Sequence, residues 1–172
     1  MRKIITGTFL LFIASAATAQ AQAPTAATDI TAAQVQAFIK SAPQDRNSDR
    51  PIRVVDAGGY RVGIFGVFRP KGTPPNATVH QTKVAEVYYV LEGAGTLVTG
   101  GTLKKPATPR PSNLGSWTDV ASDGIDGGVS RRVAKGDVIF IPGGVPHGWA
   151  STEGDVTYLI VRPDPDNKLS LK

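Results

Sequence analysis

The chain has 172 residues and contains no cysteine, one methionine and only two histidines. Without cysteine there is no disulfide framework and no lipid-modified cysteine, so the fold must be stabilised by its hydrophobic core. A domain of about 150 residues can bury enough apolar surface for this purpose. The chain is too short for two ordinary domains, and we expect one.

The sequence also lacks any apolar run of the roughly 20 residues that a helix needs to cross a bilayer. Arg2 and Lys3 precede a shorter apolar stretch over residues 4–14, and small residues that fit an Ala-x-Ala cleavage rule follow over residues 17–21. These features in this order are typical of a secretory signal peptide. We therefore predict a signal peptide over residues 1–21, a periplasmic or secreted location and no stable membrane anchor.

A strong excess of one charge is missing as well. The formal net charge is +5, from 19 basic and 14 acidic residues, and two of the basic residues lie in the predicted signal peptide. The other basic residues are scattered among loop-forming residues, and no helix-turn-helix segment is present. We therefore expect that the protein does not bind nucleic acid.

One helix is predicted near the N-terminus, after a low-complexity linker over residues 22–28. In the helical segment, residues 29–43, Thr31 can cap the helix and Gln34 can complete a capping box. Pro43 ends the helix. The apolar stripe that would pack against the following segment consists of Val35, Phe38 and Ile39.

Residues 44–165 are dominated by short runs rich in Val, Ile, Tyr and Phe, separated by Gly and Pro. Such runs are typical of strands and turns. Many short strands with one helix at the end indicate an all-β domain, an antiparallel sandwich or barrel. The clearest runs are "IRVVDAGGYRVGIFGVF", "VYYVLEGAGTLVTGG", "VSRRVAKGDVIFIP" and "DVTYLIVRP".

Residues 100–128 differ from the rest of the domain, because Gly, Pro, Ser, Asn, Asp and Lys dominate and Trp117 is the only large aromatic residue. A loop of this length in a compact domain is usually functional or disordered. The simpler interpretation is a solvated insertion. The alternative is a lid or a subunit contact in which Trp117 covers the mouth of a pocket.

The first histidine lies close to a glutamate in a strand-like run. Residues of equal parity face the same side of a strand, so His80, Thr82, Glu86 and Tyr88 can all face the barrel interior if the strand has a short kink before Glu86. An imidazole and a carboxylate buried there need a partner, since burying an unpaired charge costs several kcal/mol. A divalent cation would satisfy both groups. Otherwise only Lys83, which has the opposite parity, and the distant arginines could neutralise Glu86.

The second histidine, His147, follows a predicted strand over residues 138–141 and shares one strand face with Trp149 and Ser151. If this strand lies beside the first one, His147 becomes the third ligand of the metal. Two imidazoles and one carboxylate leave open coordination positions, as in catalytic metal sites. The pocket beside the metal would be lined by Thr82, Tyr88, Trp149 and Ser151.

Both segments resemble the paired motifs of the cupin superfamily. The first cupin motif runs glycine, five residues, His-x-His, three or four residues, glutamate, six residues, glycine, and this chain has His80, Glu86 and Gly93 at matching positions. The second motif runs glycine, five residues, Pro-x-Gly, two residues, histidine, three residues, asparagine, and it is matched by Gly136, Pro142, Gly144 and His147. The resemblance covers about residues 54–161. It implies a cupin-type antiparallel β-barrel, also called a double-stranded β-helix or jelly roll.

The chain departs from the cupin pattern at several positions. Thr82 stands in place of the second histidine, Ser151 stands in place of the asparagine, and Gly72 lies two residues too early to be the leading glycine. The segment between the two motifs is also longer than in compact cupins. With Thr82, either the remaining two histidines and one glutamate still bind a metal, or the protein is a cupin that has lost its metal.

The resemblance implies a metal-dependent enzyme that acts on a small molecule by an oxygenase, isomerase or lyase type of reaction. The metal would be Fe, Mn, Ni or Zn, acting as a Lewis acid or, in the case of iron, activating O2. Glu86 and Tyr88 are the candidate catalytic bases. The alternative is a non-catalytic cupin that binds a small ligand. The small number of candidate acids and bases favours this alternative. The resemblance also suggests a homodimer, with the helix over residues 31–40 as a candidate contact.

Overall fold

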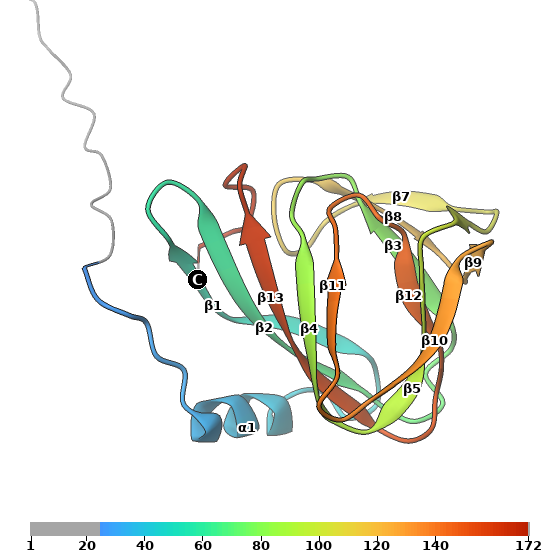
Figure 1. The fold of residues 1–172 in the computed structure, drawn as a ribbon, viewed down its shortest axis with the longest axis horizontal. Coiled ribbons are helices and arrows are strands. Elements are labelled where there is room, and N and C mark those ends of the chain that lie inside the picture. Colours follow the sequence, from blue (N-terminus) through green and yellow to red (C-terminus); the bar gives the residue numbers. More distant parts are fainter. Residues whose placement is uncertain (1–24, 172) are drawn as a thin grey trace, which may run out of the picture.

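One α-helix precedes a series of antiparallel strands in the computed structural model, which describes residues 25–171 (Figure 1). The predicted signal peptide and the first residues of the predicted linker lie outside the described residues. Within residues 25–171, no helix is both long and apolar enough to cross a membrane.

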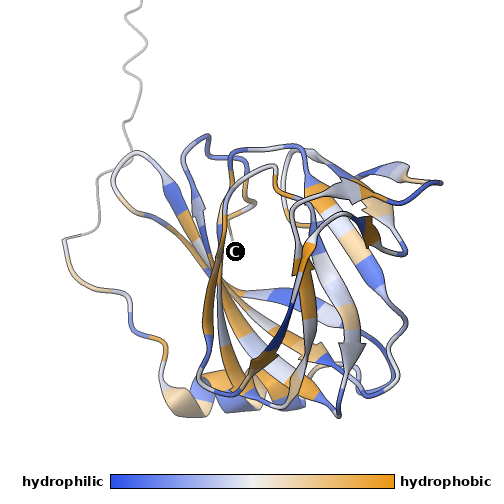
Figure 2. Cartoon of the chain, turned by 45° about the vertical axis from the view of Figure 1, so that its right-hand side comes forward, coloured by the Kyte–Doolittle hydropathy of each residue, from blue (hydrophilic) through white to orange (hydrophobic). Residues whose placement is uncertain are grey.

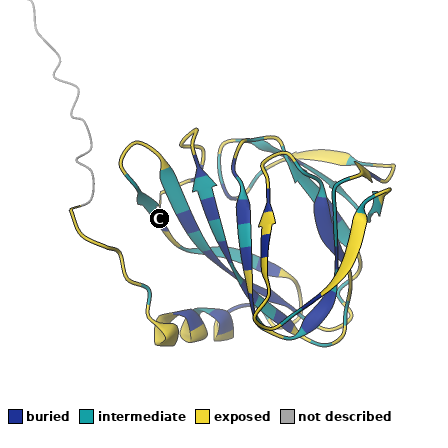
Figure 3. Ribbon diagram, viewed as in Figure 1, coloured by how far each residue is buried: buried dark blue, intermediate teal, exposed yellow. Residues whose placement is uncertain are grey.

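The N-terminal helix, α1 (Ala32–Lys40), has the predicted capping box. Thr31 Oγ1 accepts a hydrogen bond from the Gln34 backbone at 3.2 Å, and Gln34 Oε1 accepts one from the Thr31 backbone at 2.8 Å. The apolar face of α1 is turned toward the barrel, as the buried residues in Figure 3 show. The helix lies so close to the sheet that a Cβ atom on Gly66 would be 2.9 Å from the ring of Phe38.

The strands follow α1 without a further helix in the described part of the chain. Figure 2 shows hydrophobic residues along the strands, with most of the connecting turns hydrophilic. The strands are β1 (Ser48–Asp56), β2 (Arg61–Arg69), β3 (Asn76–His80), β4 (Glu86–Glu92), β5 (Ala94–Thr99), β6 (Thr102–Leu103), β7 (Thr108–Pro111), β8 (Thr118–Ser122), β9 (Ile125–Asp126), β10 (Val129–Ala134), β11 (Val138–Ile141), β12 (His147–Thr152) and β13 (Val156–Asp164).

Two sheets face each other and enclose the core (Figure 1). One has five strands in the order β1-β2-β13-β4-β11, and the other has six in the order β10-β5-β12-β3-β8-β7. Every pair of neighbours in these sheets is antiparallel. From β2 to β5 and from β10 to β13, the chain passes from one sheet to the other at each successive strand, which is the winding of a double-stranded β-helix, whereas β1 with β2 and β7 with β8 each pair within one sheet. The predicted fold class, an antiparallel cupin-type barrel with one N-terminal helix, is confirmed.

The residue pattern of β13, the last strand, explains why one face of its sheet packs on the core. Along β13 buried and half-buried residues alternate, as expected for a strand with one face on the core. The chain continues past β13, and Leu169, which is fully buried, joins the same core. Residues beyond 165 therefore also pack against the barrel.

The segment between the two cupin motifs is folded rather than a solvated loop. It contributes β6, β7, β8 and β9, and β8 pairs with β3 so that Asp119 lies opposite His80. Trp117 packs against the core beside His80, with ring centroids 6.1 Å apart. The segment therefore forms part of the wall of the barrel.

The prediction that one kinked strand carries His80, Thr82 and Glu86 is wrong. β3 ends at His80 in the six-stranded sheet, and β4 begins at Glu86 in the five-stranded sheet. Residues 81–85 are the connection between the sheets, so the two ligand candidates face each other from opposite sides of the barrel.

Candidate functional site

The three residues predicted to bind a metal lie together inside the barrel. His80 is the last residue of β3, Glu86 is the first of β4, and His147 is the first of β12, which pairs with β3. One potential ligand atom from each residue lies within 4.8 Å of the other two. Glu86 and His147 are buried, and the side chain of His80 is 12% exposed.

Both imidazoles face the same carboxylate with their Nε2 atoms. His80 Nε2 lies 3.4 Å from Glu86 Oε1, and His147 Nε2 lies 3.1 Å from Glu86 Oε2. The centroids of the two imidazole rings are 5.3 Å apart.

The Nδ1 atoms of both histidines contact oxygen acceptors. His80 Nδ1 is 2.5 Å from Asp119 Oδ1, and His147 Nδ1 is 2.9 Å from the carbonyl oxygen of Val145. A carbonyl and a carboxylate only accept hydrogen bonds, so each Nδ1 carries the proton and a neutral imidazole has its lone pair on Nε2. Histidines that bind a metal usually donate their other ring N–H to a carboxylate or carbonyl oxygen in this way. The donor set therefore fits a divalent ion.

Glu86 also has a protein cation beside it, which the sequence analysis did not expect. Arg162, on β13, donates a hydrogen bond through Nε to Glu86 Oε1 at 2.7 Å. Its Nη1 and Nη2 atoms donate to the two carboxylate oxygens of Asp49 at 3.0 and 2.6 Å. One of the distant arginines therefore neutralises Glu86, so the carboxylate does not need a metal for this purpose. The positive charge of Arg162 also repels a metal ion bound at Glu86 and so weakens its binding.

The charges of this cluster shift its pKa values. Burial alone would raise the pKa of Glu86, but Arg162 and His147 outweigh burial and hold that pKa well below its usual value. Burial alone would lower the pKa of His80, but hydrogen bonds to Asp119 and Glu86 raise it to about 9. Without a metal, the Glu86 carboxylate therefore lies between two cations, Arg162 and protonated His80.

The other predicted site residues fall into two groups. Tyr88 and Trp149 are buried and line the cavity, and the Tyr88 hydroxyl donates to Glu86 Oε2 at 3.0 Å. Burial, with the negative charge of Glu86, raises the pKa of Tyr88 well above its usual value, so Tyr88 is a proton donor rather than a base. Thr82 and Ser151 are not part of the cavity wall, contrary to the prediction.

Local backbone geometry explains why these two residues miss the pocket. Thr82 lies in the connection after β3, where its Oγ1 accepts a hydrogen bond from the Val84 backbone at 3.4 Å. On β12 the register with β5 shifts between Trp149 and Ser151, which ends the parity relation that predicted Ser151 to face inward. Ser151 is exposed.

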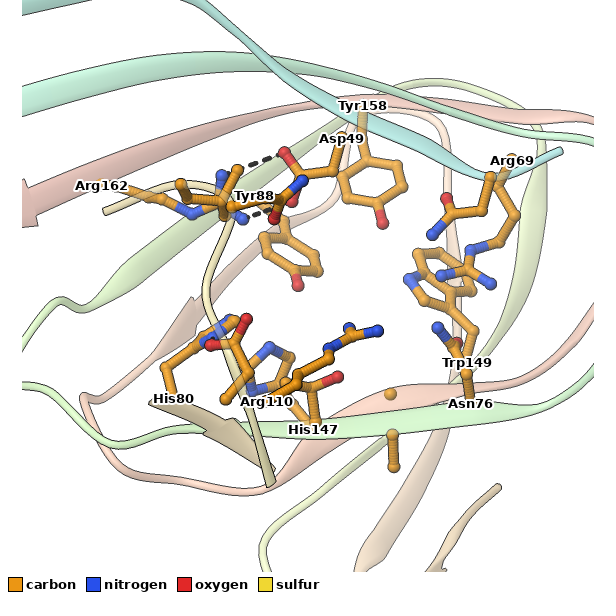
Figure 4. Close-up of a pocket in the computed structure, with 17 residues that line it drawn as sticks. Asp49, Arg69, Asn76, His80, Tyr88, Arg110, His147, Trp149, Tyr158 and Arg162 are labelled. Atoms are coloured by element: carbon orange, nitrogen blue, oxygen red, sulfur yellow. Dashed lines mark hydrogen bonds and ion pairs between the residues drawn. The ribbon is translucent and has the colours of Figure 1, made fainter. Parts of the chain in front are cut away.

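A cavity of about 360 Å³ opens beside the three residues (Figure 4). The histidines and Tyr88 lie at one end of it, and Arg69, Trp149 and Asn76 lie at the other end. The segment between the motifs contributes to the wall through Arg110, Asn113, Leu114 and Asp119.

Sequence reasoning missed several residues of this site, among them Asp49, Arg69, Asn76, Arg110, Asp119 and Arg162. A signal for Arg162 was present, because it shares the parity of the apolar residues Val156, Tyr158 and Ile160 on β13. An arginine in register with core residues needs a buried acidic partner, and Glu86 was the candidate.

No family model matches the chain, and no curated protein sequence does. The solved structures similar to it include an uncharacterized conserved protein with a double-stranded beta-helix domain from Klebsiella pneumoniae, at 12% identity and a TM-score of 0.48, over 84% of this chain and 97% of that chain. An RmlC-like cupin protein from Desulfovibrio desulfuricans is similar at 16% identity and a TM-score of 0.40, over 70% of this chain and 85% of that chain.

Peruvianin-I, a cysteine peptidase from the latex of Thevetia peruviana, is similar at 12% identity and a TM-score of 0.39, over 64% of this chain. The match spans 55% of the Peruvianin-I chain, so the present protein corresponds to about half of its length. The protein has the cupin fold. This follows from its own strand order and from the way the two motif segments bring His80, Glu86 and His147 together.

Proposed function

We propose that the protein is an exported cupin that binds a divalent metal ion through His80, Glu86 and His147 and acts on a small molecule in the adjoining cavity. The observation that carries this proposal is the convergence of the three ligand atoms within 4.8 Å. The hydrogen bonds at both Nδ1 atoms support it further, since they turn the two Nε2 lone pairs toward the same point.

The cavity supports a small molecule as the binding partner. A volume of about 360 Å³ lies at the lower end of the range of ligand pockets and suits a molecule of modest size. The cavity adjoins both histidines, so a ligand in it can reach the open coordination positions of the ion. A bound metal would supply Lewis-acid polarisation of a substrate oxygen.

The residues of the chain offer proton donors more readily than bases. Tyr88 keeps its proton and donates a hydrogen bond to Glu86, and Glu86 also accepts a hydrogen bond from Arg162. Such a site favours reactions driven by the binding and polarisation of substrate oxygens, of the oxygenase, isomerase or lyase type. Export to the periplasm or outside the cell is supported by Arg2, Lys3 and the apolar stretch that follows them.

Metal analysis of the purified protein tests the proposal. We expect close to one equivalent of Fe, Mn, Ni or Zn per chain in the wild type, measured by inductively coupled plasma mass spectrometry. His147→Ala should lose most of this metal, because it removes one of three ligands. Ser151→Ala is the matched control, since Ser151 is exposed and should leave the metal content unchanged. A folded wild-type protein that neither contains nor takes up metal would contradict the proposal.

The second candidate function is a metal-free cupin that binds a small ligand without catalysis. The observation that favours it is the 2.7 Å hydrogen bond between Arg162 and Glu86, which neutralises the carboxylate without a metal. Equilibrium dialysis separates the two functions. Absence of metal uptake together with retained ligand binding supports this second function.

A further inference from the structure

The end of the cavity away from the histidines contains a buried arginine without a carboxylate partner. Arg69, at the end of β2, is 3% exposed. Its Nε and Nη1 atoms are shielded from solvent and have no hydrogen-bond partner among the described residues. Buried polar groups in proteins are nearly always hydrogen-bonded, and leaving one unsatisfied costs about 1–3 kcal/mol, more for a charged group. An unpartnered buried guanidinium facing a cavity therefore indicates a ligand.

Two more polar side chains at this end lack a partner. The Nε1 donor of Trp149 and the Oδ1 acceptor of Asn76 are both buried without a hydrogen bond of good geometry among residues 25–171. Burial raises the pKa of Tyr158, and Arg69 and Trp149 lie close enough to its hydroxyl to oppose that rise. The guanidinium carbon of Arg69 lies 5.8 Å from the centre of the Trp149 ring. Figure 4 shows Arg69, Trp149 and Asn76 grouped on one side of the cavity, with the Tyr158 hydroxyl facing the same space. Two donors and one acceptor are thus available side by side.

The charges around the cavity favour an anion. Asp49 is engaged by Arg162, and Asp119 is engaged by His80 and by the indole nitrogen of Trp117. Arg69 and Arg110 both line the cavity and form no ion pair within the described part of the chain. The charge that the protein leaves uncompensated in this cavity is therefore positive.

We propose that Arg69, Trp149 and Asn76 bind the carboxylate end of a small hydroxylated organic acid. The planar fork of Arg69 suits a carboxylate, with Trp149 as a further donor, and a hydroxyl group of the ligand donates to Asn76 Oδ1. This inference rests on the proposed function, because the other end of the same ligand reaches the centre formed by His80, Glu86 and His147.

The strand that connects the two ends limits the length of the ligand. His147 and Trp149 are two residues apart on β12 and both are buried. Side chains two residues apart on a strand lie about 6–7 Å apart. A chain of about five carbon atoms with an oxygen group at each end spans this distance. The substrate class is therefore a short acid with a second oxygen function at its far end.

Calorimetric titration with 3-hydroxyglutarate tests this inference. Two wild-type samples are compared, one treated with chelator and one loaded with metal. Both should bind 3-hydroxyglutarate, and neither should bind glutaramide, a neutral molecule of similar length. Arg69→Met and Trp149→Phe should each weaken this binding about tenfold or more, because each removes a donor to a charged group. Both variants should keep the metal content of the wild type. Arg131→Met removes an exposed arginine on β10 and is the control.

The outcomes separate this inference from the proposed function. Loss of metal in His147→Ala with retained binding of the acid supports both. A metal-free wild type that still binds the acid through Arg69 contradicts the proposed function alone. Equal binding of glutaramide and the acid, equally tight binding of inorganic phosphate, or unchanged binding in Arg69→Met overturns the inference. If Arg69→Met fails to fold, Trp149→Phe decides, since it keeps an aromatic ring and removes only the indole N–H.

Discussion

At the scale of single residues, the decisive feature is the arginine beside the candidate ligand Glu86. Arg162 is 2% exposed and is the only cation that contacts both Glu86 and Asp49 among the described residues. Arg162→Met removes the cation that the carboxylates of Glu86 and Asp49 share. We expect the free energy of unfolding, measured by urea titration, to fall by about 3–5 kcal/mol.

The same variant should bind the metal more tightly than the wild type, because the repulsion between guanidinium and ion is gone and Glu86 needs a counter-charge. Added Zn should therefore restore part of its lost stability. Arg132→Met removes an exposed ion pair with Glu153 and should leave the urea midpoint near that of the wild type. Equal stability of both variants would mean that Arg162 does not hold the cluster together.

At the scale of elements, the site depends on the close approach of β3 and β12, which carry the two histidines. Gly148 makes this approach possible, since a Cβ atom there would lie 2.0 Å from the carbonyl oxygen of Asn76. Gly148→Ala should push the strands apart, lower the free energy of unfolding by about 1–3 kcal/mol and weaken metal binding. Thermal unfolding and metal titration measure the two effects. Gly154→Ala has open space around it and should change neither.

At the scale of the whole molecule, the homodimer expected from the sequence stays a prediction, and the structure favours one face for it. The apolar residues of α1, Val35 and Ile39, are buried within the same chain and are not available for a partner. The outer face of β4 and the edge strand β11 instead exposes Tyr89, Val138 and Phe140 by 46, 66 and 64% (Figure 3). An open edge strand with an apolar outer face suits pairing with a second copy of this chain.

We therefore expect Phe140→Glu to convert the dimer to a monomer in sedimentation velocity measurements, because it places a charge in an apolar contact. Lys40→Glu, on α1, should leave the dimer intact. A wild type that sediments as a monomer at tens of micromolar, or a dimer broken only by the change on α1, would contradict this assignment.

The sequence by itself determined the features that depend on neighbours along the chain. The capping box of α1 involves residues three apart, and the turn at Gly93 involves a backbone with φ of 83°, which glycine adopts readily. The strands in the four clearest runs followed from their β-branched and aromatic residues, whereas β6 to β9 in the segment between the motifs did not. The pairing of the two motif segments was also expected from the chain, because the cupin resemblance supplied a long-range constraint that strand patterns lack.

Only the tertiary structure decided what surrounds Glu86. Arg162 and Asp49 are 113 residues apart, and Asp119 reaches His80 across the pairing of β8 with β3. Which strands become neighbours depends on sheet order and register, and these are set by packing of the whole core rather than by local preference. The same is true of Thr82 and Ser151, since a crossing between sheets and a one-residue register shift turned both away from the cavity.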